Sequence, residues 1–379
     1  MRHLSGRLKR FVLFTRCLLA ALIRGAADMP PTNPATIIVV PTGKLGDIVC
    51  CTPVFRALRA RLPHARLVAL GPKLVEPLLE HSGLVDAHID IGADNAIDHI
   101  RAEHADAAVV LGPSFGSAVL LCLAHLPLVV IPKVVGGYSP NETRLYKLLS
   151  RFVATYPYHR GEYAPRERLR ALEPLGIVID DTTKKLGFSD AGAATAAQFL
   201  ADNSIDPKKD FVVGISPSAG NKIKEWPAER FAQVADYLIE KYDAKIVIIG
   251  SAADAAKAAE MKQYLHTPVA DATGAFDLDT LKASISKLSL FISVDTGPIY
   301  IAEAFNVPTI DIVGPVDEKV QPPRGPLHRN VIPERTHPML SILNARSYDE
   351  TEAVRQVNSI TVAAVTHELD LLIAAMRGV

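Results

Sequence analysis

An aspartate that follows a glycine-containing turn is the first residue placed for chemistry. Asp47 comes after Gly43 and Gly46, and this turn follows four aliphatic residues, 37–40. A buried strand that leads into such a turn and a helix puts the aspartate at the carboxyl edge of a parallel sheet, where open α/β folds bind ligands. Asp is also a favoured helix N-cap, because its carboxylate accepts N–H bonds of the first turn. The residues alone leave Asp47 open to a catalytic or a capping role.

The glycine spacing of this turn limits the class of ligand that it could bind. It reads G-x-x-G-D, which lacks the full G-x-G-x-x-G pattern of dinucleotide-binding turns, and no G-K-[ST] stands at a phosphate-loop spacing. A nicotinamide cofactor and ATP hydrolysis are therefore disfavoured.

Two turns in the second half of the chain carry groups suited to an anion. The first, residues 216–227, combines hydroxyl groups, a glycine and two lysines. The second precedes a helix that starts at Gly297-Pro298, whose free N–H groups and dipole attract negative charge. A solvated loop anchored by Trp226 and an ordinary helix cap are the alternatives. We expect both turns to bind one diphosphate. The candidate residues are Ser218, Lys222, Lys224, Asp295, Thr296 and Gly297.

The remaining acidic candidates are weaker. Asp254 follows another expected strand and could contact a ribose hydroxyl, although a capping carboxylate is the preferred interpretation. The D-x-D formed by Asp277 and Asp279 is better explained as a helix start than as a metal–diphosphate site. No cysteine or histidine spacing indicates a metal, and the four cysteines are expected to be reduced thiols, mostly buried.

The elements that position these residues alternate between strand and helix. Strands are expected at 37–40, 66–70, 88–91, 107–111, 211–216, 245–249, 290–294 and 309–313, and further apolar segments lie at 118–125 and 127–132. A helix is expected near 47–61, with Ile48, Val54, Phe55 and Leu58 on its apolar face. Residues 155–174 are expected to form a connecting, charged helical region. This alternation predicts an α/β fold with two doubly wound halves and a cleft between them. The predicted organisation is an arm at 1–35, a first domain at 36–180, a connection at 181–205, a second domain at 206–350, and a C-terminal helix at 351–379 that packs back toward the first domain.

The amino terminus is a cationic arm in an otherwise balanced chain. The 379 residues carry 41 basic and 41 acidic side chains, so no global field recruits nucleic acid, yet no acidic residue precedes Asp28. Apolar residues recur at helical spacing through 4–22, with cations on the other side, as in a helix on an anionic membrane. The apolar runs are too short for a spanning helix. A helix docked on the protein and a signal sequence are the alternatives.

Taken together, the motifs resemble glycosyltransferase family 9, the lipopolysaccharide heptosyltransferase family of Gram-negative bacteria. The resemblance rests on Lys44-Leu-Gly-Asp47, Lys224-Glu-Trp-Pro227 and Asp295-Thr-Gly-Pro298, in this order and spacing. It implies the GT-B fold, two Rossmann-like domains facing a central cleft. It also implies inverting, metal-independent transfer of a sugar, such as heptose, from a nucleotide diphospho-sugar to a lipopolysaccharide or other lipid-linked acceptor. No cofactor is implied beyond this donor.

The resemblance assigns roles to single residues. Asp47 matches the family's base, which deprotonates the acceptor hydroxyl. Lys224 matches the diphosphate-binding lysine, and the N–H groups of Thr296 and Gly297 share the leaving group's charge. Asp254 and Phe276 match positions that surround the nucleoside in the family, and Lys44 matches a position that faces the acceptor.

One position departs from the family pattern. Members commonly carry a histidine where this chain has Tyr300. A tyrosine donates a hydrogen bond but stays neutral at pH 7, so it offers the diphosphate no cation.

The alternative functions are a sugar-nucleotide epimerase or hydrolase on the same fold, and a non-catalytic nucleotide-sugar-binding protein. Transfer to a lipid-linked acceptor is the preferred hypothesis. It places the protein on the cytoplasmic face of the inner membrane, with residues 2–24 on the anionic surface.

Overall fold

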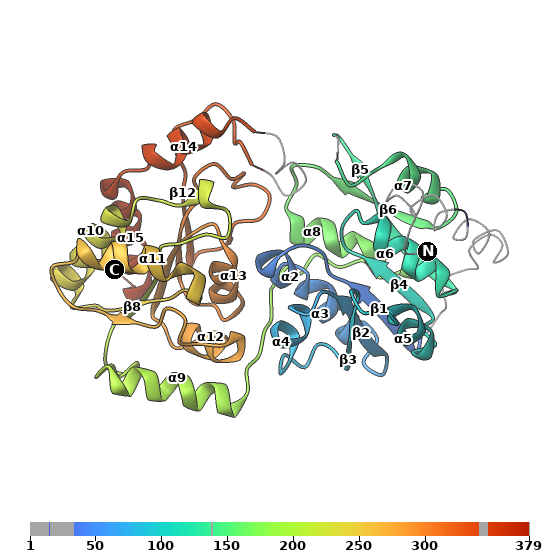
Figure 1. The fold of residues 1–379 in the computed structure, drawn as a ribbon, viewed down its shortest axis with the longest axis horizontal. Coiled ribbons are helices and arrows are strands. Elements are labelled where there is room, and N and C mark those ends of the chain that lie inside the picture. Colours follow the sequence, from blue (N-terminus) through green and yellow to red (C-terminus); the bar gives the residue numbers. More distant parts are fainter. Residues whose placement is uncertain (1–14, 16–33, 138, 341–347, 379) are drawn as a thin grey trace. The chain divides into compact units, whose positions relative to one another are not determined.

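The chain forms two compact units, which a computed structural model describes for residue 15 and residues 34–137, 139–340 and 348–378. The first unit ends at Thr183 and the second begins at Lys184 (Figure 1). Apart from Thr15 and residues 34–35, the predicted cationic arm lies outside the described residues.

The first unit is built on a six-stranded parallel sheet with the order β3-β2-β1-β4-β5-β6. Its strands are β1 (Thr36–Val40), β2 (Arg66–Gly71), β3 (Ala87–Asp90), β4 (Ala107–Val110), β5 (Leu128–Val135) and β6 (Ala154–His159). Its helices are α2 (Leu45–Val49), α3 (Thr52–Arg61), α4 (Val75–Leu79), α5 (Ala96–Ala102), α6 (Phe115–Leu123), α7 (Arg144–Leu149), α8 (Ala164–Leu169) and the 3-10 helix η1 (Arg170–Leu175). The aliphatic central strands β1 and β4 are buried, as a sheet covered on both faces requires.

The second unit repeats this architecture with the order β12-β11-β10-β7-β8-β9, again parallel throughout. Its strands are β7 (Val212–Ser216), β8 (Lys245–Ile248), β9 (Ala270–Asp271), β10 (Leu290–Val294), β11 (Thr309–Ile312) and β12 (His328–Val331). Its helices are α9 (Asp190–Asp202), η2 (Lys222–Lys224), α10 (Ala228–Tyr242), η3 (Ala252–Asp254), α11 (Ala255–Gln263), α12 (Leu278–Ile285), α13 (Gly297–Ala304), α14 (Glu350–Ser359) and α15 (Val362–Arg377).

The first strand of each unit occupies the same topological place. β1 lies between β2 and β4, and β7 lies between β8 and β10. The strand order reverses direction beside each of these strands, and such switch points are where doubly wound folds bind ligands. The α/β fold with two doubly wound halves, predicted from the alternation of elements, is confirmed.

The sequence prediction named no strand at β5, β6, β9 or β12, and the region of β5 was expected only as an apolar segment. β6 falls in residues 155–174, which were expected to form a connecting, charged helical region. Pro157 lies inside this edge strand, where its missing N–H is tolerated. β9 and β12 are also edge strands, and β12 has the polar sequence HRNV, which carries no hydrophobic strand signal.

Two predicted connecting segments belong to the second unit. The predicted connection at 181–205 contains α9, which packs beside α12 (Figure 1). The C-terminal helix α15 packs against α10 and buries Val365, Leu369 and Leu372 in the core of the second unit. The predicted packing of this helix toward the first domain stays a prediction.

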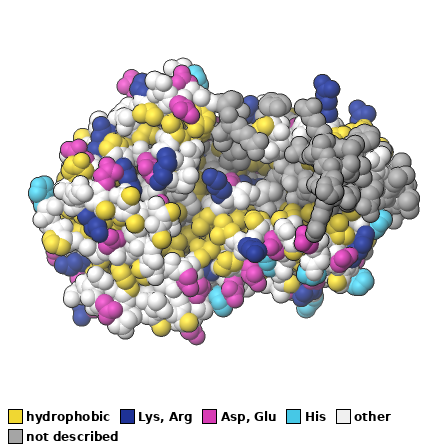
Figure 2. All heavy atoms as spheres, viewed as in Figure 1, with side chains coloured by type: hydrophobic (Ala, Val, Ile, Leu, Met, Phe, Trp, Pro, Cys, Tyr) yellow, Lys and Arg dark blue, Asp and Glu magenta, His cyan; other side chains and the backbone are white. Residues whose placement is uncertain are grey.

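None of the described helices is alone long and apolar enough to cross a membrane. α14 and α15 pass that test only as a pair bent by 55°, by length and composition. Figure 2 shows acidic and basic side chains interspersed over the visible face of the second unit.

Candidate functional site

The turn after β1 holds Asp47 as the third residue of α2, and Lys44 is the N-cap. The Lys44 N–H donates to Asp47 Oδ2 at 2.9 Å, so Asp47 caps its helix from within the first turn rather than from the N-cap itself. The side chain keeps 24% of its exposure. Its carboxylate is therefore engaged by the turn without being sealed inside it.

Gly43 makes this position of the carboxylate possible. Its φ of +97° is a left-handed conformation that favours glycine. A Cβ at this position would lie 2.2 Å from Asp47 Oδ2. Any side chain at residue 43 would therefore displace the carboxylate.

The helix predicted near 47–61 is in fact two helices, α2 and α3, separated at Cys50 and Cys51. Pro53 has no N–H for the Val49 carbonyl, and the Thr52 hydroxyl donates to that carbonyl instead, at 2.7 Å. The predicted apolar face is confirmed as fully buried. Its residues are Ile48, Val54, Phe55 and Leu58.

A buried arginine that the sequence prediction missed holds Asp47 in place. Arg168, on α8, is only 2% exposed. Its Nη1 donates to the Asp47 backbone carbonyl at 3.0 Å and its Nη2 to Asp47 Oδ1 at 3.3 Å. Burial opposes the charge of Arg168, but the neighbouring Cys51, Tyr158 and Asp47 groups outweigh it and raise the pKa of the guanidinium. The carboxylate is thus fixed from two sides.

Three cations lie at the carboxyl edge of the first sheet. Lys44 is exposed after β1, Lys133 is exposed near the end of β5, and Arg160 follows β6 half-buried. Among the described residues none of the three has an ion-pair partner. Unpaired cations at the ligand-binding edge of a doubly wound sheet are suited to an anionic ligand.

In the second unit the two predicted anion-binding turns are in contact. Lys224 Nζ donates to the backbone carbonyl of Asp295 and, at 2.9 Å, to its Oδ2. The Tyr300 hydroxyl donates to Asp295 Oδ1. The Asp295 side chain is 8% exposed and that of Lys224 17% exposed. Lys224 is therefore the partner that retains access to solvent.

The helix that follows Asp295 begins without a side-chain cap. Thr296 is the N-cap of α13, Gly297 is its first residue and Pro298 its second. Pro298 has no N–H, and the Ile299 N–H donates to the Thr296 carbonyl at 3.3 Å. The N–H groups of Thr296 and Gly297 are therefore the ones that could reach an anion beside Lys224.

Ser218, Lys222 and Asp254 form a second cluster in this unit. Ser218 donates to the Asp254 carboxylate, and Lys222 bonds Glu225 at 2.6 Å. Asp254 also accepts from the Ser251 N–H and hydroxyl, which confirms the preferred capping interpretation. Burial alone would raise the pKa of Asp254, but the hydrogen bonds from Ser218 and Ser251 outweigh burial and lower it. The cluster thus holds one ionised carboxylate and a lysine whose side chain is 68% exposed.

The other predicted positions have local structural partners. Phe276 packs edge-on against Phe199, with ring centroids 5.0 Å apart. Asp277 is the N-cap of α12, as expected, and Asp279 accepts the Ser189 hydroxyl at 2.6 Å. Across the described ranges, no group of three or more acidic, histidine or cysteine side chains could hold a metal.

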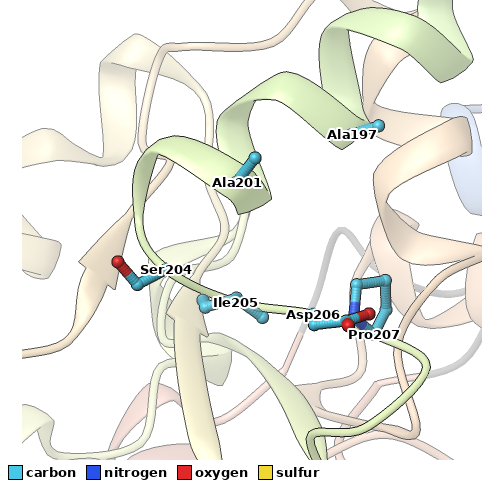
Figure 3. Close-up of a pocket in the computed structure, with 6 residues that line it drawn as sticks. All are labelled: Ala197, Ala201, Ser204, Ile205, Asp206 and Pro207. Carbon is cyan, nitrogen blue, oxygen red and sulfur yellow. The ribbon is translucent and has the colours of Figure 1, made fainter.

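A hollow of about 400 Å³ lies at the end of α9 (Figure 3). None of the predicted site residues lines it. Its walls are Ala197, Ala201, Ser204, Ile205, Asp206 and Pro207.

Comparison with known proteins identifies the family. Glycosyltransferase family 9 (heptosyltransferase) matches residues 95–343. Lipopolysaccharide heptosyltransferase 3 of Escherichia coli K12 is 27% identical over 286 residues, which cover 72% of this chain and 80% of that protein. Among solved structures, a family 9 glycosyltransferase from Veillonella parvula superposes with a TM-score of 0.69 at 20% identity, covering 90% of this chain and 98% of that one.

A second structure, E. coli ADP-heptose lps heptosyltransferase II, gives the same TM-score and identity over 90% of this chain and 99% of that chain. The two Rossmann-like units are those of the GT-B fold. The chain belongs to glycosyltransferase family 9 and is a heptosyltransferase-like glycosyltransferase.

Proposed function

We propose that this protein is an inverting, metal-independent heptosyltransferase that moves heptose from a nucleotide diphospho-sugar to a lipopolysaccharide or other lipid-linked glycan. The matched family and a relative named lipopolysaccharide heptosyltransferase support the reaction class. The name of a solved structural neighbour specifies ADP-heptose, which supports this donor. The observation that carries the proposal is the Asp47 carboxylate, partly exposed yet held by the Lys44 N–H and by Arg168.

In this mechanism Asp47 is the general base. It accepts the proton of the acceptor hydroxyl while the hydroxyl oxygen forms a bond to the anomeric carbon of the donor. The bond from that carbon to the diphosphate oxygen breaks on the opposite face, and the diphosphate leaves with the electron pair. The configuration at the anomeric carbon is thereby inverted. Arg168 holds the carboxylate in one orientation throughout, which a base requires.

The second unit receives the donor. Lys224 and the uncapped N–H groups of Thr296 and Gly297 stabilise the charge that develops on the leaving diphosphate. This positive field is the contribution that a divalent metal makes in other glycosyl transfer sites. The nucleoside is assigned to the neighbouring polar cluster and its aromatic neighbour. These residues are Ser218, Lys222, Asp254 and Phe276.

The first unit receives the acceptor. Lys44, Lys133 and Arg160 are cations without ion-pair partners among the described residues, at the carboxyl edge that carries Asp47. They suit an acceptor with phosphate or carboxylate groups. Residues 2–24 would hold the protein on the cytoplasmic surface of an anionic membrane that contains this acceptor.

The test is an assay with radiolabelled ADP-heptose and lipopolysaccharide truncated before its heptoses. We expect label to enter the acceptor with inverted anomeric configuration, and activity to survive prolonged chelation of divalent metals. Release of heptose without acceptor would instead identify a hydrolase, and donor binding with no reaction would identify a binding protein.

Membrane attachment has a separate test. Deletion of residues 1–28 is expected to move the protein from the membrane to the soluble fraction without changing turnover on a soluble acceptor. A deletion variant that stays on the membrane would eliminate this role of the arm.

A further inference from the structure

A row of polar side chains crosses the second sheet on the face opposite its hydrophobic core. Along β10 and β11, Ile292 and Ile310 point into the core, and the alternating positions Ser293 and Asp311 point to the other face. The register pairs Ser293 with Asp311, and Asp311 with Asn330 on β12. The carboxyl group of Asp311 therefore lies inside the protein among polar neighbours.

Asp311 has no hydrogen-bond partner in the described part of the chain. Its side chain is fully buried, and both carboxyl oxygens lack a donor. Asn330, on the neighbouring strand, also has a buried oxygen without a hydrogen-bond donor. Asn330 Nδ2 donates to the Pro323 carbonyl at 3.1 Å, which fixes the amide and leaves its buried Oδ1 without a donor.

A single proton on Asp311 would give a partner to one of its oxygens and to Asn330 Oδ1. A carboxylate only accepts hydrogen bonds, so an ionised Asp311 could not donate to Asn330, its register partner on the adjacent strand. A carboxylic acid donates, and the register places Asn330 on the adjacent strand as its acceptor. Buried polar groups are nearly always satisfied in native structures, which favours the protonated form.

The charges around Asp311 also favour its protonated form. The groups that act on it are Asp295 after β10, Lys224 on η2 and Glu303 on α13. Glu303 is itself paired with the buried Lys184 at 2.6 Å, and burial together with Lys184 lowers the pKa of His328 to about 4, so this histidine is neutral. Two ammonium groups thus balance the carboxylates of Asp295 and Glu303. Burial, and then the charge of Asp295, raise the pKa of Asp311 well above its ordinary value.

We propose that Asp311 is a neutral carboxylic acid that donates to Asn330 and so preserves the positive charge of Lys224 for the donor diphosphate. Asp311 is a positioning residue, since it acts through Lys224 and not on the substrate. An ionised Asp311 would add an unbalanced negative charge beneath the site and would compete with the diphosphate for Lys224. The role in donor binding rests on the proposed function, whereas the protonation of Asp311 does not.

The protonation is tested by infrared difference spectroscopy of the full-length protein against Asp311→Asn at neutral pH. We expect a carbonyl stretch of a protonated carboxylic acid that the variant lacks. A difference spectrum that contains only carboxylate bands would overturn the proposal. This result does not depend on any activity.

The role in donor binding is tested by calorimetry with ADP as the probe. Asparagine is neutral and donates to Asn330 as the acid does, so Asp311→Asn should bind ADP at neutral pH within about threefold of the parent, as should the exposed control Asp202→Asn. A second variant, Asn330→Asp, places two carboxyl groups on one proton and should weaken ADP binding about tenfold or more. A tenfold loss in Asp311→Asn, or parental affinity in Asn330→Asp, would refute the role. If the parent itself does not bind ADP, the proposed donor site fails while the infrared result on Asp311 stands.

Discussion

The candidate sites of the two units are ion pairs of opposite design on sheets of the same topology. In the first unit the buried partner is the cation Arg168, 2% exposed, and the accessible partner is the carboxylate of Asp47, 24% exposed. In the second unit the buried partner is the carboxylate of Asp295, 8% exposed, and the accessible partner is the ammonium of Lys224, 17% exposed. Each buried group fixes the accessible one, and the accessible group determines the chemistry that its unit can offer.

The comparison shows that the topology of the sheet does not determine the sign of the accessible charge. Both pairs lie at the carboxyl edge beside the switch point of a doubly wound sheet, where the fold directs polar side chains toward a ligand. The sign of the accessible charge comes from the loop sequences. Under the proposed function, the carboxylate in the first unit takes a proton and the ammonium group in the second unit binds the diphosphate.

Removal of the accessible carboxylate should have the largest effect. Asp47→Asn keeps the shape and the hydrogen bond from the Lys44 N–H but cannot take a proton, so we expect kcat to fall about 10²- to 10⁴-fold while ADP binding changes little. The measurement is steady-state transfer together with calorimetry. Asp94→Asn, an exposed aspartate of the same unit, is the control. Parental turnover in Asp47→Asn would remove the base assignment.

Removal of the accessible cation should act on the donor. Lys224→Ala leaves the buried Asp295 unpaired and takes a charge from the diphosphate site, so we expect the KM for the donor to rise about 10- to 100-fold. Lys209→Ala is the control, because Lys209 is an exposed lysine of the same unit that pairs with Asp206 instead. We expect a change of about threefold or less in this control, since its pair is exposed. Equal effects of the two substitutions would contradict the distinction between the lysines.

A substitution at Gly43 tests how finely the first pair is positioned. Alanine here would collide with the Asp47 carboxylate and hold a left-handed conformation, so we expect kcat to fall about tenfold or more. Gly176→Ala has the same kind of φ, +73°, but its Cβ would meet nothing within 4 Å. Both variants should lose thermal stability, and only Gly43→Ala should lose turnover. A similar loss of turnover in both would attribute the effect to backbone strain.

The hydroxyl that supports the second pair should have the smallest effect. Tyr300→Phe removes the hydrogen bond to Asp295 Oδ1 while Lys224 keeps Oδ2, so we expect the donor KM to rise about two- to tenfold. Tyr300→His restores the residue common in the family and should leave kcat within about threefold of the parent. A larger loss in Tyr300→Phe than in Lys224→Ala would reverse the order of importance of these contacts.

The candidate residues in each turn could be predicted because the motif that identifies them is short and continuous in the sequence. A strand, a glycine turn and an acidic residue lie within a dozen positions around Asp47, and the motifs at Lys224 and Asp295 are equally compact. Arg168 was missed because it lies 121 residues from Asp47 and has no motif of its own. Asp311 was missed because it is a single acidic position in a short buried strand and its polar neighbours come from other strands.

The fold class was predictable for a related reason. The hydrophobic segments in the centres of the sheets can be recognised from their composition. In contrast, β6, β9 and β12 lie at sheet edges, where fewer positions need to be apolar. The packing of α15 could not be read from its amphipathic pattern, because that pattern gives a buried face and not the surface that covers it.

The cysteine under the Asp47 turn gives the protein a natural reporter. Cys51 is fully buried, its Sγ donates to the Asp47 carbonyl at 3.2 Å, and burial raises the pKa of the thiol. A thiol in this state is attacked by alkylating reagents only after the surrounding structure opens. The rate at which Cys51 is alkylated in the native protein would therefore report how often the segment that carries Asp47 opens locally, without any engineered label.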